Sequence, residues 1–234
     1  MKRTEMYTDG RYLQNNPGWN EEDAVYKAQW LKTILDKNEV VPASITEVGC
    51  GSGKVLVELS RLLPSNIIYN GYDISPIPLE RAQSFSSSNI HFHHADYLAD
   101  DYPSAEMVLV FDVIEHLEDY YSFLEKLRNK GQTFAFHIPL DLSCRTLLKP
   151  HVMMQQRNAV GHIHYFSRDM VQWLLADTGY TIIDWRYTKP ITDTKPAQGL
   201  KKNVKRVLRN FSFSLNENYS ADLWGDYSMM ILAR

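Results

Sequence analysis

One short segment constrains this chain more than any other, the stretch from Ile45 to Lys54. It reads as the end of a buried strand, a glycine-rich turn and the start of a helix. Glycine stands at every second position of the turn, at Gly49, Gly51 and Gly53, where the backbone can bend sharply and approach a ligand closely. The first residues of the helix offer backbone N–H groups that have no helical partner. The segment therefore predicts a strand–turn–helix unit with a ligand site at the turn.

The spacing of the glycines and a following acid indicate the class of ligand. The dinucleotide fingerprint is Gly-x-Gly-x-x-Gly, whereas here the third glycine comes one residue early and Glu47 precedes the turn. A second strand-like run, Ile67–Asp73, ends in an acid about twenty residues past the glycines, where a carboxylate can bind both hydroxyls of a ribose. Alone, Asp73 would equally suit a helix N-cap or a turn. Together with the glycine turn, it favours an adenosine-type ligand.

The rest of the chain alternates strand and helix patterns. Strands are predicted at Ser44–Val48, Ile67–Asp73, Ile90–His94, Met107–Phe111, Thr133–Ile138, Thr181–Tyr187 and Tyr227–Ala233. Helices are predicted from the N-cap Asn20 to Asp36, at Lys54–Leu63, at Pro78–Phe85, at Tyr120–Asn129 with Gly131 as C-cap, and between Ser167 and Gly179. Nearly continuous apolar strands are typical of a sheet that helices cover on both faces. The alternation predicts a doubly wound, mostly parallel α/β sheet.

The predicted strand ends gather polar residues at one edge of that sheet. Asp73, Asp96, Asp112 and His137 all lie at or just past the end of a strand. Ligands of such sheets bind beyond the carboxyl ends of the strands, so these side chains are expected to converge. The segment Asp141–Ile163 shows little periodicity and is predicted to be a long connection that forms part of a substrate wall.

Net charge and one basic segment limit the partners. The 234-residue chain has a net charge of −3, which argues against nucleic-acid binding by the molecule as a whole. From Thr194 to Asn216 there is no acid, six residues are lysine or arginine, and apolar residues of Leu200–Phe211 fall at helical spacing. This basic amphipathic helix is expected to pack its apolar side on the domain as a lid. The alternatives are peripheral contact with an anionic membrane and a clamp for a phosphorylated, carrier-bound or nucleic-acid substrate.

At this point the sequence resembles the class I S-adenosylmethionine-dependent methyltransferases, particularly their small-molecule branch. The matching segments, in the family's order and spacing, are Glu47–Gly53, Gly71–Ser75, Ala95–Tyr97 and Val110–Leu117. The resemblance implies a seven-stranded Rossmann-like sheet whose last strand is antiparallel. It also implies a single domain over residues 1–234. Its parts would be a leader and cap helix at 1–40, a cofactor-binding core at 41–187, a basic helical insert at 188–225 and the last strand at 226–234.

The resemblance implies a cofactor site at the strand ends, made of Glu47, Gly49, Gly51, Gly53, Asp73, Ile74, Asp96, Tyr97 and Asp112. The glycines would hold the backbone against the methionine part and the ribose, and Asp73 would bind the ribose hydroxyls. Asp96 would accept a hydrogen bond from the adenine amino group, while Tyr97 and Ile74 flank the ring. Asp112 would lie near the methionine ammonium, and Glu47 would support the loop and that end of the site.

Direct displacement of a methyl group from a sulfonium requires alignment of the reactants and needs no metal in principle. His116 is the best candidate for a general base, because it follows the fourth strand and an unperturbed histidine has a pKa of about 6.5. It would alternatively be a helix-start or substrate-positioning residue, and His137, His162 and His164 are further candidates. No cysteine or carboxylate pattern stands beside His162 and His164, so no metal site is predicted.

The sequence therefore predicts methyl transfer from S-adenosylmethionine to the oxygen or nitrogen of a small-molecule acceptor. Alternatives are a non-catalytic scaffold that keeps the fold, methylation of a lipid- or carrier-linked substrate, and a nicotinamide-dependent oxidoreductase, which the glycine spacing disfavours. With two cysteines, no apolar stretch in Met1–Gly10 and no run of eighteen apolar residues, a cytoplasmic protein is expected. The sequence does not indicate an oligomeric state.

Overall fold

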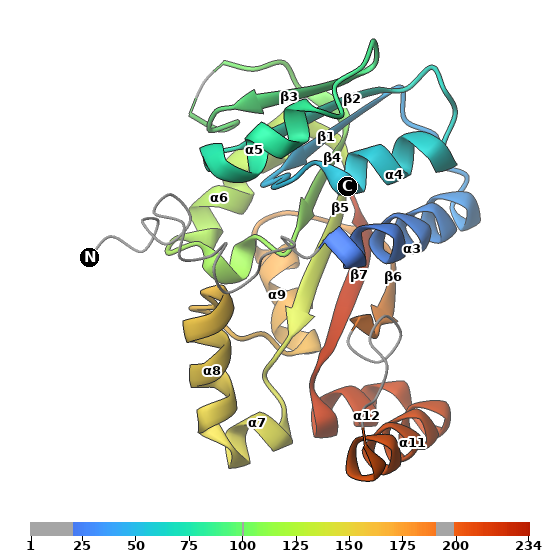
Figure 1. Cartoon of the computed structure of the whole chain (residues 1–234), viewed down its shortest axis with the longest axis vertical. Coiled ribbons are helices and arrows are strands. Elements are labelled where there is room, and N and C mark those ends of the chain that lie inside the picture. The colour runs from blue at the N-terminus through green and yellow to red at the C-terminus, as the bar shows by residue number, and fades with distance from the viewer. Residues whose placement is uncertain (1–20, 100, 191–198) are drawn as a thin grey trace.

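The computed structural model describes residues 21–99, 101–190 and 199–234, and these form a seven-stranded sheet with the strand order β3-β2-β1-β4-β5-β7-β6 (Figure 1). The strands are β1 (Ser44–Val48), β2 (Ile68–Asp73), β3 (Ile90–His94), β4 (Ala105–Phe111), β5 (Gly131–Leu140), β6 (Ile182–Thr188) and β7 (Tyr227–Ala233). Strands β1 to β5 pair in parallel, and β7 runs antiparallel to both β5 and β6. The predicted mostly parallel sheet with an antiparallel last strand is confirmed.

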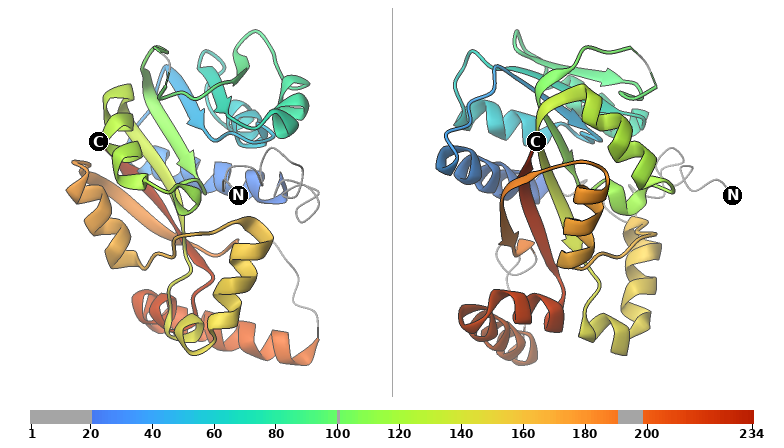
Figure 2. Two further views of the ribbon diagram at one scale, coloured as in Figure 1. Left: turned by 90° about the vertical axis from the view of Figure 1, so that its left-hand side faces the viewer. Right: turned by 180° about the vertical axis from the view of Figure 1, so that it is seen from behind.

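Helices cover both faces of the sheet, as the alternating side chains of β4 require (Figures 1 and 2). The helical segments are η1 (Glu21–Asp23), α3 (Ala24–Lys37), α4 (Lys54–Leu62), α5 (Pro76–Gln83), η2 (Ile114–His116), α6 (Tyr120–Leu127), η3 (Arg128–Lys130), α7 (Cys144–Leu148), α8 (Pro150–Val160), α9 (Arg168–Asp177), α11 (Leu200–Leu215) and α12 (Glu217–Trp224). Val108 and Val110 of β4 join a core under α6 and α9, whereas Met107 and Leu109 join a second core under α3, α4 and α5. Both faces are therefore apolar, which explains the continuous apolar runs in the sequence.

Two predicted features differ in the structure. Gly131 is the C-cap residue, as predicted, but it caps the short η3 that follows α6, and its backbone is extended rather than left-handed because it begins β5. A Cβ at this position would lie 2.8 Å from Cγ2 of Val108, so the glycine allows β5 to lie close against β4.

The predicted irregular connection Asp141–Ile163 contains α7 and α8. Helix α7 is short and starts with a capping box, and α8 has no buried residue, so neither produces an apolar stripe in the sequence. The predicted N-cap Asn20 lies outside the described residues.

The basic amphipathic helix α11 forms, but it faces the opposite way from the lid that the sequence predicts. Phe213 packs against the core, whereas six other apolar side chains are 50–80% exposed, namely Leu200, Val204, Val207, Leu208, Phe211 and Leu215. Arg209 is instead buried, where it donates to Asp226 Oδ2 at 3.2 Å and to the Gly225 carbonyl at 2.8 Å. Arg145 binds the other oxygen of Asp226. The largely buried carboxylate of Asp226, between two arginines, therefore anchors α11 through Arg209.

Helices α11 and α12 lie at the end of the molecule opposite α4 and α5 (Figures 1 and 2). The exposed face of α11 is therefore remote from the glycine turn that precedes α4. Among the described residues, no helix combines the length and the hydropathy needed to cross a bilayer.

Candidate active site

A cavity of about 230 Å³ lies where the sequence predicts the ligand, beyond the carboxyl ends of β1, β2 and β4. Seven of the predicted site residues line it, and they are Glu47, Gly49, Gly51, Asp73, Ile74, Asp112 and His116. Helix α3 and the preceding turn contribute Glu21, Ala24 and Lys27 from the other side. The helix that the resemblance implied as a cap therefore borders the cavity.

The glycine turn owes its shape to left-handed backbone angles, since φ is +75° at Gly49, +52° at Gly51 and +72° at Gly53. A Cβ at Gly49 would lie 2.6 Å from Val113 Cγ2, and one at Gly53 would lie 2.2 Å from the Phe92 ring. Gly53 therefore serves the packing of α4 on β3 and does not line the cavity. At Gly51 no atom lies within 4 Å of the added Cβ, so this backbone is open for the close approach of a ligand.

Two predicted adenine-binding residues also lie outside the cavity wall. Asp96 is exposed, and its carboxylate accepts a hydrogen bond from the Leu98 backbone N–H at 3.0 Å. Tyr97 is a core residue rather than a residue flanking the ligand, because only 1% of it is exposed and its hydroxyl donates to the Pro103 carbonyl at 2.9 Å. The aromatic ring of Tyr72 packs against it. The sequence pattern placed both residues after β3, but it held no information on which way each side chain turns.

Asp73 joins the end of β2 to the glycine turn. One carboxylate oxygen accepts the Gly51 backbone N–H at 2.7 Å, and the other accepts the Ser75 N–H at 2.8 Å. Burial raises the pKa of Asp73 above its ordinary value, although the donors of Ser75 and Gly51 oppose the shift. The side chain therefore shapes the turn and also lines the cavity.

A partly buried charged network that sequence reasoning missed lies at the centre of the site. Lys27 of α3 donates to one oxygen of Asp112 at 2.5 Å, and Nδ1 of His137 lies 2.6 Å from the other. The second nitrogen of His137 lies 2.9 Å from the hydroxyl of Thr188 on β6. Burial alone would raise the pKa of Asp112, but Lys27 and His137 hold it well below its usual range. The carboxylate of Asp112 therefore stays charged with both of its oxygens engaged.

Glu47 differs from Asp112 because its partners are incomplete. The side chain is buried, and its Oε2 atom has no hydrogen-bond partner among the described residues. Burial raises the pKa of Glu47 to about 8, although Lys27 opposes the shift. An unsatisfied carboxyl group in the cavity wall is an expensive feature for a protein without a ligand. It fits a site that a cationic or hydrogen-bonding group completes.

A second cavity of about 270 Å³ adjoins the first and shares Lys27, Asp112 and His116 with it. The 141–163 segment contributes Asp141, Gln156, Val160 and His162 to its wall. Nδ1 of His162 lies 2.7 Å from Asp141, which also accepts a hydrogen bond from Gln156 at 2.7 Å. The segment predicted as a substrate wall therefore borders a cavity next to the ligand site.

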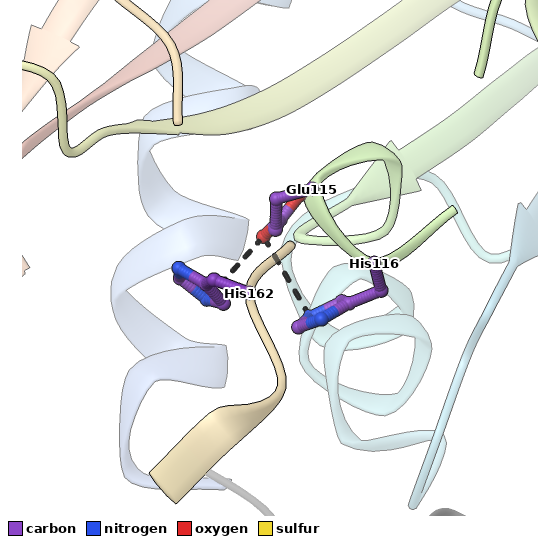
Figure 3. Close-up of side chains that lie close together, drawn as sticks. All are labelled: Glu115, His116 and His162. Atoms are coloured by element: carbon purple, nitrogen blue, oxygen red, sulfur yellow. Dashed lines mark ion pairs between the residues drawn. The ribbon is translucent and has the colours of Figure 1, made fainter. Parts of the chain in front are cut away.

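Glu115, His116 and His162 point toward one another at the junction of the two cavities (Figure 3). Burial raises the pKa of Glu115 to about 8, and burial together with the nearby His162 lowers the pKa of His116 to about 4. His116 is therefore neutral at pH 7. The sequence showed no carboxylate pattern beside the histidines, because Glu115 reaches His162 only through the fold.

A family model described as a methyltransferase domain matches residues 19–184. The chain belongs to the class I S-adenosylmethionine-dependent methyltransferases. The match includes the glycine turn, Asp73, Asp112 and His116, so the site of this methyltransferase lies within the segment that defines the family.

Solved structures with the same fold cover most of this methyltransferase. The magnesium protoporphyrin IX methyltransferase of Synechocystis PCC 6803, with bound S-adenosylhomocysteine, is 15% identical with a TM-score of 0.59, over 89% of this chain and 82% of that one. A methyltransferase of Haloferax volcanii in complex with the activator Trm112 is 15% identical with a TM-score of 0.67. The match covers 100% of this chain and 96% of that one. The cyclase SpnF is 13% identical with a TM-score of 0.57, and the match covers 88% of this chain and 80% of that one. At these identities the likeness shows the fold alone.

Replacing Glu47 with glutamine is expected to stabilise the ligand-free protein at high pH only. The pKa of Glu47 in the folded protein, about 8, exceeds its unfolded value of about 4.5. Below pH 4.5 the carboxyl is protonated in both states, whereas between pH 4.5 and 8 the unfolded chain ionises first and the wild type loses stability. The variant avoids this loss, so its advantage in free energy of unfolding should grow to about 2–5 kcal/mol above pH 8.

Denaturant titrations at about pH 4, 6 and 8.5 measure this difference, with Glu125→Gln on the exposed side of α6 as the control. A difference that stays constant over this pH range would show that Glu47 ionises normally in the folded protein.

Proposed function

We propose that this methyltransferase transfers the methyl group of S-adenosylmethionine to an oxygen or nitrogen of a small-molecule acceptor held in the second cavity. One observation carries the proposal: the two cavities share Lys27, Asp112 and His116. A molecule in the second cavity therefore lies next to the occupant of the first. In the transfer, the acceptor atom forms a bond to the methyl carbon as the bond from that carbon to sulfur breaks, and the sulfur keeps the electron pair.

The residues of the first cavity fit S-adenosylmethionine, which supplies an activated methyl group on a sulfonium. The open backbone at Gly51 allows close approach, and the Asp73 carboxylate is suited to the ribose hydroxyls. The sequence assigned Asp112 to the methionine ammonium, but both oxygens of Asp112 are engaged by Lys27 and His137. The lone pairs that remain on Asp112 and the unpartnered oxygen of Glu47 are both available to the ammonium.

The second cavity favours a polar acceptor of small size. Its wall carries His137, Asp141, Gln156 and His162, which provide donors and acceptors on several sides. His116 lines both cavities and would contact the acceptor close to the reacting atom. The fold also occurs in a cyclase, so consumption of the methyl donor is the decisive observation.

Cys50 and Cys144 are free thiols, which suits the cytoplasm that the sequence suggests.

Calorimetric titration with S-adenosylhomocysteine, with NAD as the comparison, tests the cofactor site. Binding of the first in the micromolar range and no binding of the second is expected. Asp73→Ala should weaken binding about 10- to 150-fold, because hydrogen bonds to a charged group contribute about 1.5–3 kcal/mol. Asp101→Ala, which removes an exposed acid outside the cavity, is the control. An unchanged dissociation constant in folded Asp73→Ala would remove Asp73 from the site and weaken the proposal.

A panel of small hydroxyl and amine acceptors, read by formation of S-adenosylhomocysteine, tests the transfer itself. If His116 acts as a general base, His116→Ala should lower kcat on the best acceptor by about 10²- to 10⁴-fold. His151→Ala removes an exposed imidazole on α8 and should leave the rate unchanged. A loss below tenfold for His116→Ala would limit this residue to a structural role. Binding of S-adenosylhomocysteine with no donor consumption over the whole panel would favour the scaffold alternative.

We also propose that α11 contacts an anionic lipid surface, because its apolar side chains are exposed and the helix contains no acid. Such a contact would bring a lipid-linked acceptor to the enzyme. Co-sedimentation with anionic vesicles is expected, and a Val207→Glu, Phe211→Glu double variant should reduce the bound fraction at least tenfold. The reason is that each substitution replaces an exposed apolar contact with a negative charge.

Trp173→Glu places the same charge on another exposed apolar residue, on α9, and should leave vesicle binding unchanged. Absence of sedimentation with anionic vesicles, or a dimer in light scattering that the double variant dissociates, would contradict the lipid contact. In the second case, α11 would instead pair with a copy of the same chain.

A further inference from the structure

Glu115 is a fully buried carboxylate with no hydrogen bond to either side-chain oxygen among the described residues. Its Oε1 atom lies 3.9 Å from Nε2 of His116 and 4.0 Å from Nε2 of His162 (Figure 3). These separations are too long for hydrogen bonds. A carboxylate taken out of water without partners is costly, so a group that satisfies Glu115 is expected between these three side chains.

The space between the three side chains is close to what a metal ion requires. The ligand atoms of Glu115, His116 and His162 lie within 4.8 Å of one another. Two ligands on a tetrahedral ion with bonds of about 2.1 Å stand about 3.4 Å apart. The two separations from Glu115 exceed this spacing by about half an ångström, and the widest separation, at most 4.8 Å, exceeds it by up to about 1.4 Å, so side-chain rotations of that size would bring all three atoms to coordination distance.

A second layer of contacts orients one of the histidines. Nδ1 of His162 lies 2.7 Å from Oδ2 of Asp141, and the other oxygen of Asp141 accepts a hydrogen bond from Gln156. This contact places the proton of neutral His162 on Nδ1 and leaves the lone pair of Nε2 facing Glu115. A carboxylate behind a histidine in this way is the usual support of a histidine that binds a metal.

We propose that Glu115, His116 and His162 bind a divalent transition-metal ion of the Zn²⁺ or Fe²⁺ type, with Asp141 as a positioning residue. Two imidazoles and one carboxylate suit these ions better than Mg²⁺ or Ca²⁺, which prefer oxygen ligands throughout. Three protein ligands leave at least one coordination position open. That position faces the second cavity, because all three residues line it.

The role of the ion rests on the proposed function, whereas its binding does not. An ion at this position would polarise an acceptor hydroxyl in the second cavity and help it to release its proton to solvent. The oxygen then forms its bond to the methyl carbon while the sulfur takes the electron pair of the broken bond. His116 borders both cavities, so the ion would lie beside the acceptor atom, on the side of the second cavity that adjoins the first.

Titration of the chelator-treated, full-length protein with Co²⁺, followed by visible absorption, and with Zn²⁺, followed by calorimetry, tests the site. One ion per chain is expected. Glu115→Gln and His162→Ala should each weaken binding at least 100-fold, and Asp141→Asn about 10- to 100-fold. His151→Ala, which removes an exposed imidazole of α8, should bind as the wild type does.

Circular dichroism and a titration with S-adenosylhomocysteine on the same samples separate the possible failures. Folded wild-type protein that binds S-adenosylhomocysteine but takes up neither Co²⁺ nor Zn²⁺ below about 100 µM would overturn the metal site and leave the proposed function intact. Unchanged ion affinity in both folded Glu115→Gln and folded His162→Ala would also overturn it. Ion binding without binding of S-adenosylhomocysteine would support the metal site and count against the proposed function.

Discussion

The interaction on which the rest of this site depends is the partly buried contact of Asp112 with Lys27 and His137. It ties α3 to the ends of β4 and β5, and through Thr188 it reaches β6. Asp112 adopts a left-handed backbone with φ of +53°, which is strained for a residue with a side chain and persists only where its surroundings hold it. Removal of one partner is expected to cost less than the about 3–5 kcal/mol typical of a fully buried ion pair, because 32% of the Asp112 side chain is exposed. The network therefore fixes the wall between the two cavities.

Three carboxyl groups in this site, the partly buried Asp112 and the buried Glu47 and Glu115, show how partners decide ionisation. Asp112 has two close cationic or donor groups, so its pKa is low. Glu47 and Glu115 have oxygens without partners, so burial raises the pKa of each to about 8. Asp112, whose oxygens are both contacted by side chains of the protein, is the carboxyl group that stays charged. The two unsatisfied carboxyls border the two cavities, which is where a ligand would provide the missing contacts.

At the opposite end of the molecule, a carboxylate is again paired with cationic side chains. Asp226 is paired with Arg145 and Arg209, and this pairing holds Arg209 of α11 inward. The apolar side of the helix is then left exposed. Amphipathic spacing usually indicates a helix that packs its apolar face on the protein. Here the helix with that spacing is held by a buried arginine instead.

The sequence by itself determined the sheet, the glycine turn and the position of Asp73, because strand alternation, helical spacing and left-handed glycines are properties of neighbouring residues. It also determined that polar residues meet at one edge, since parallel strands end together. Only the tertiary structure decided that Lys27 binds Asp112 across 85 residues, that Glu115 meets His162, and that Tyr97 turns into the core. The outward face of α11 was likewise decided by Asp226. Such contacts depend on which side chains the packing brings together, and the periodicity of the sequence does not predict these pairs.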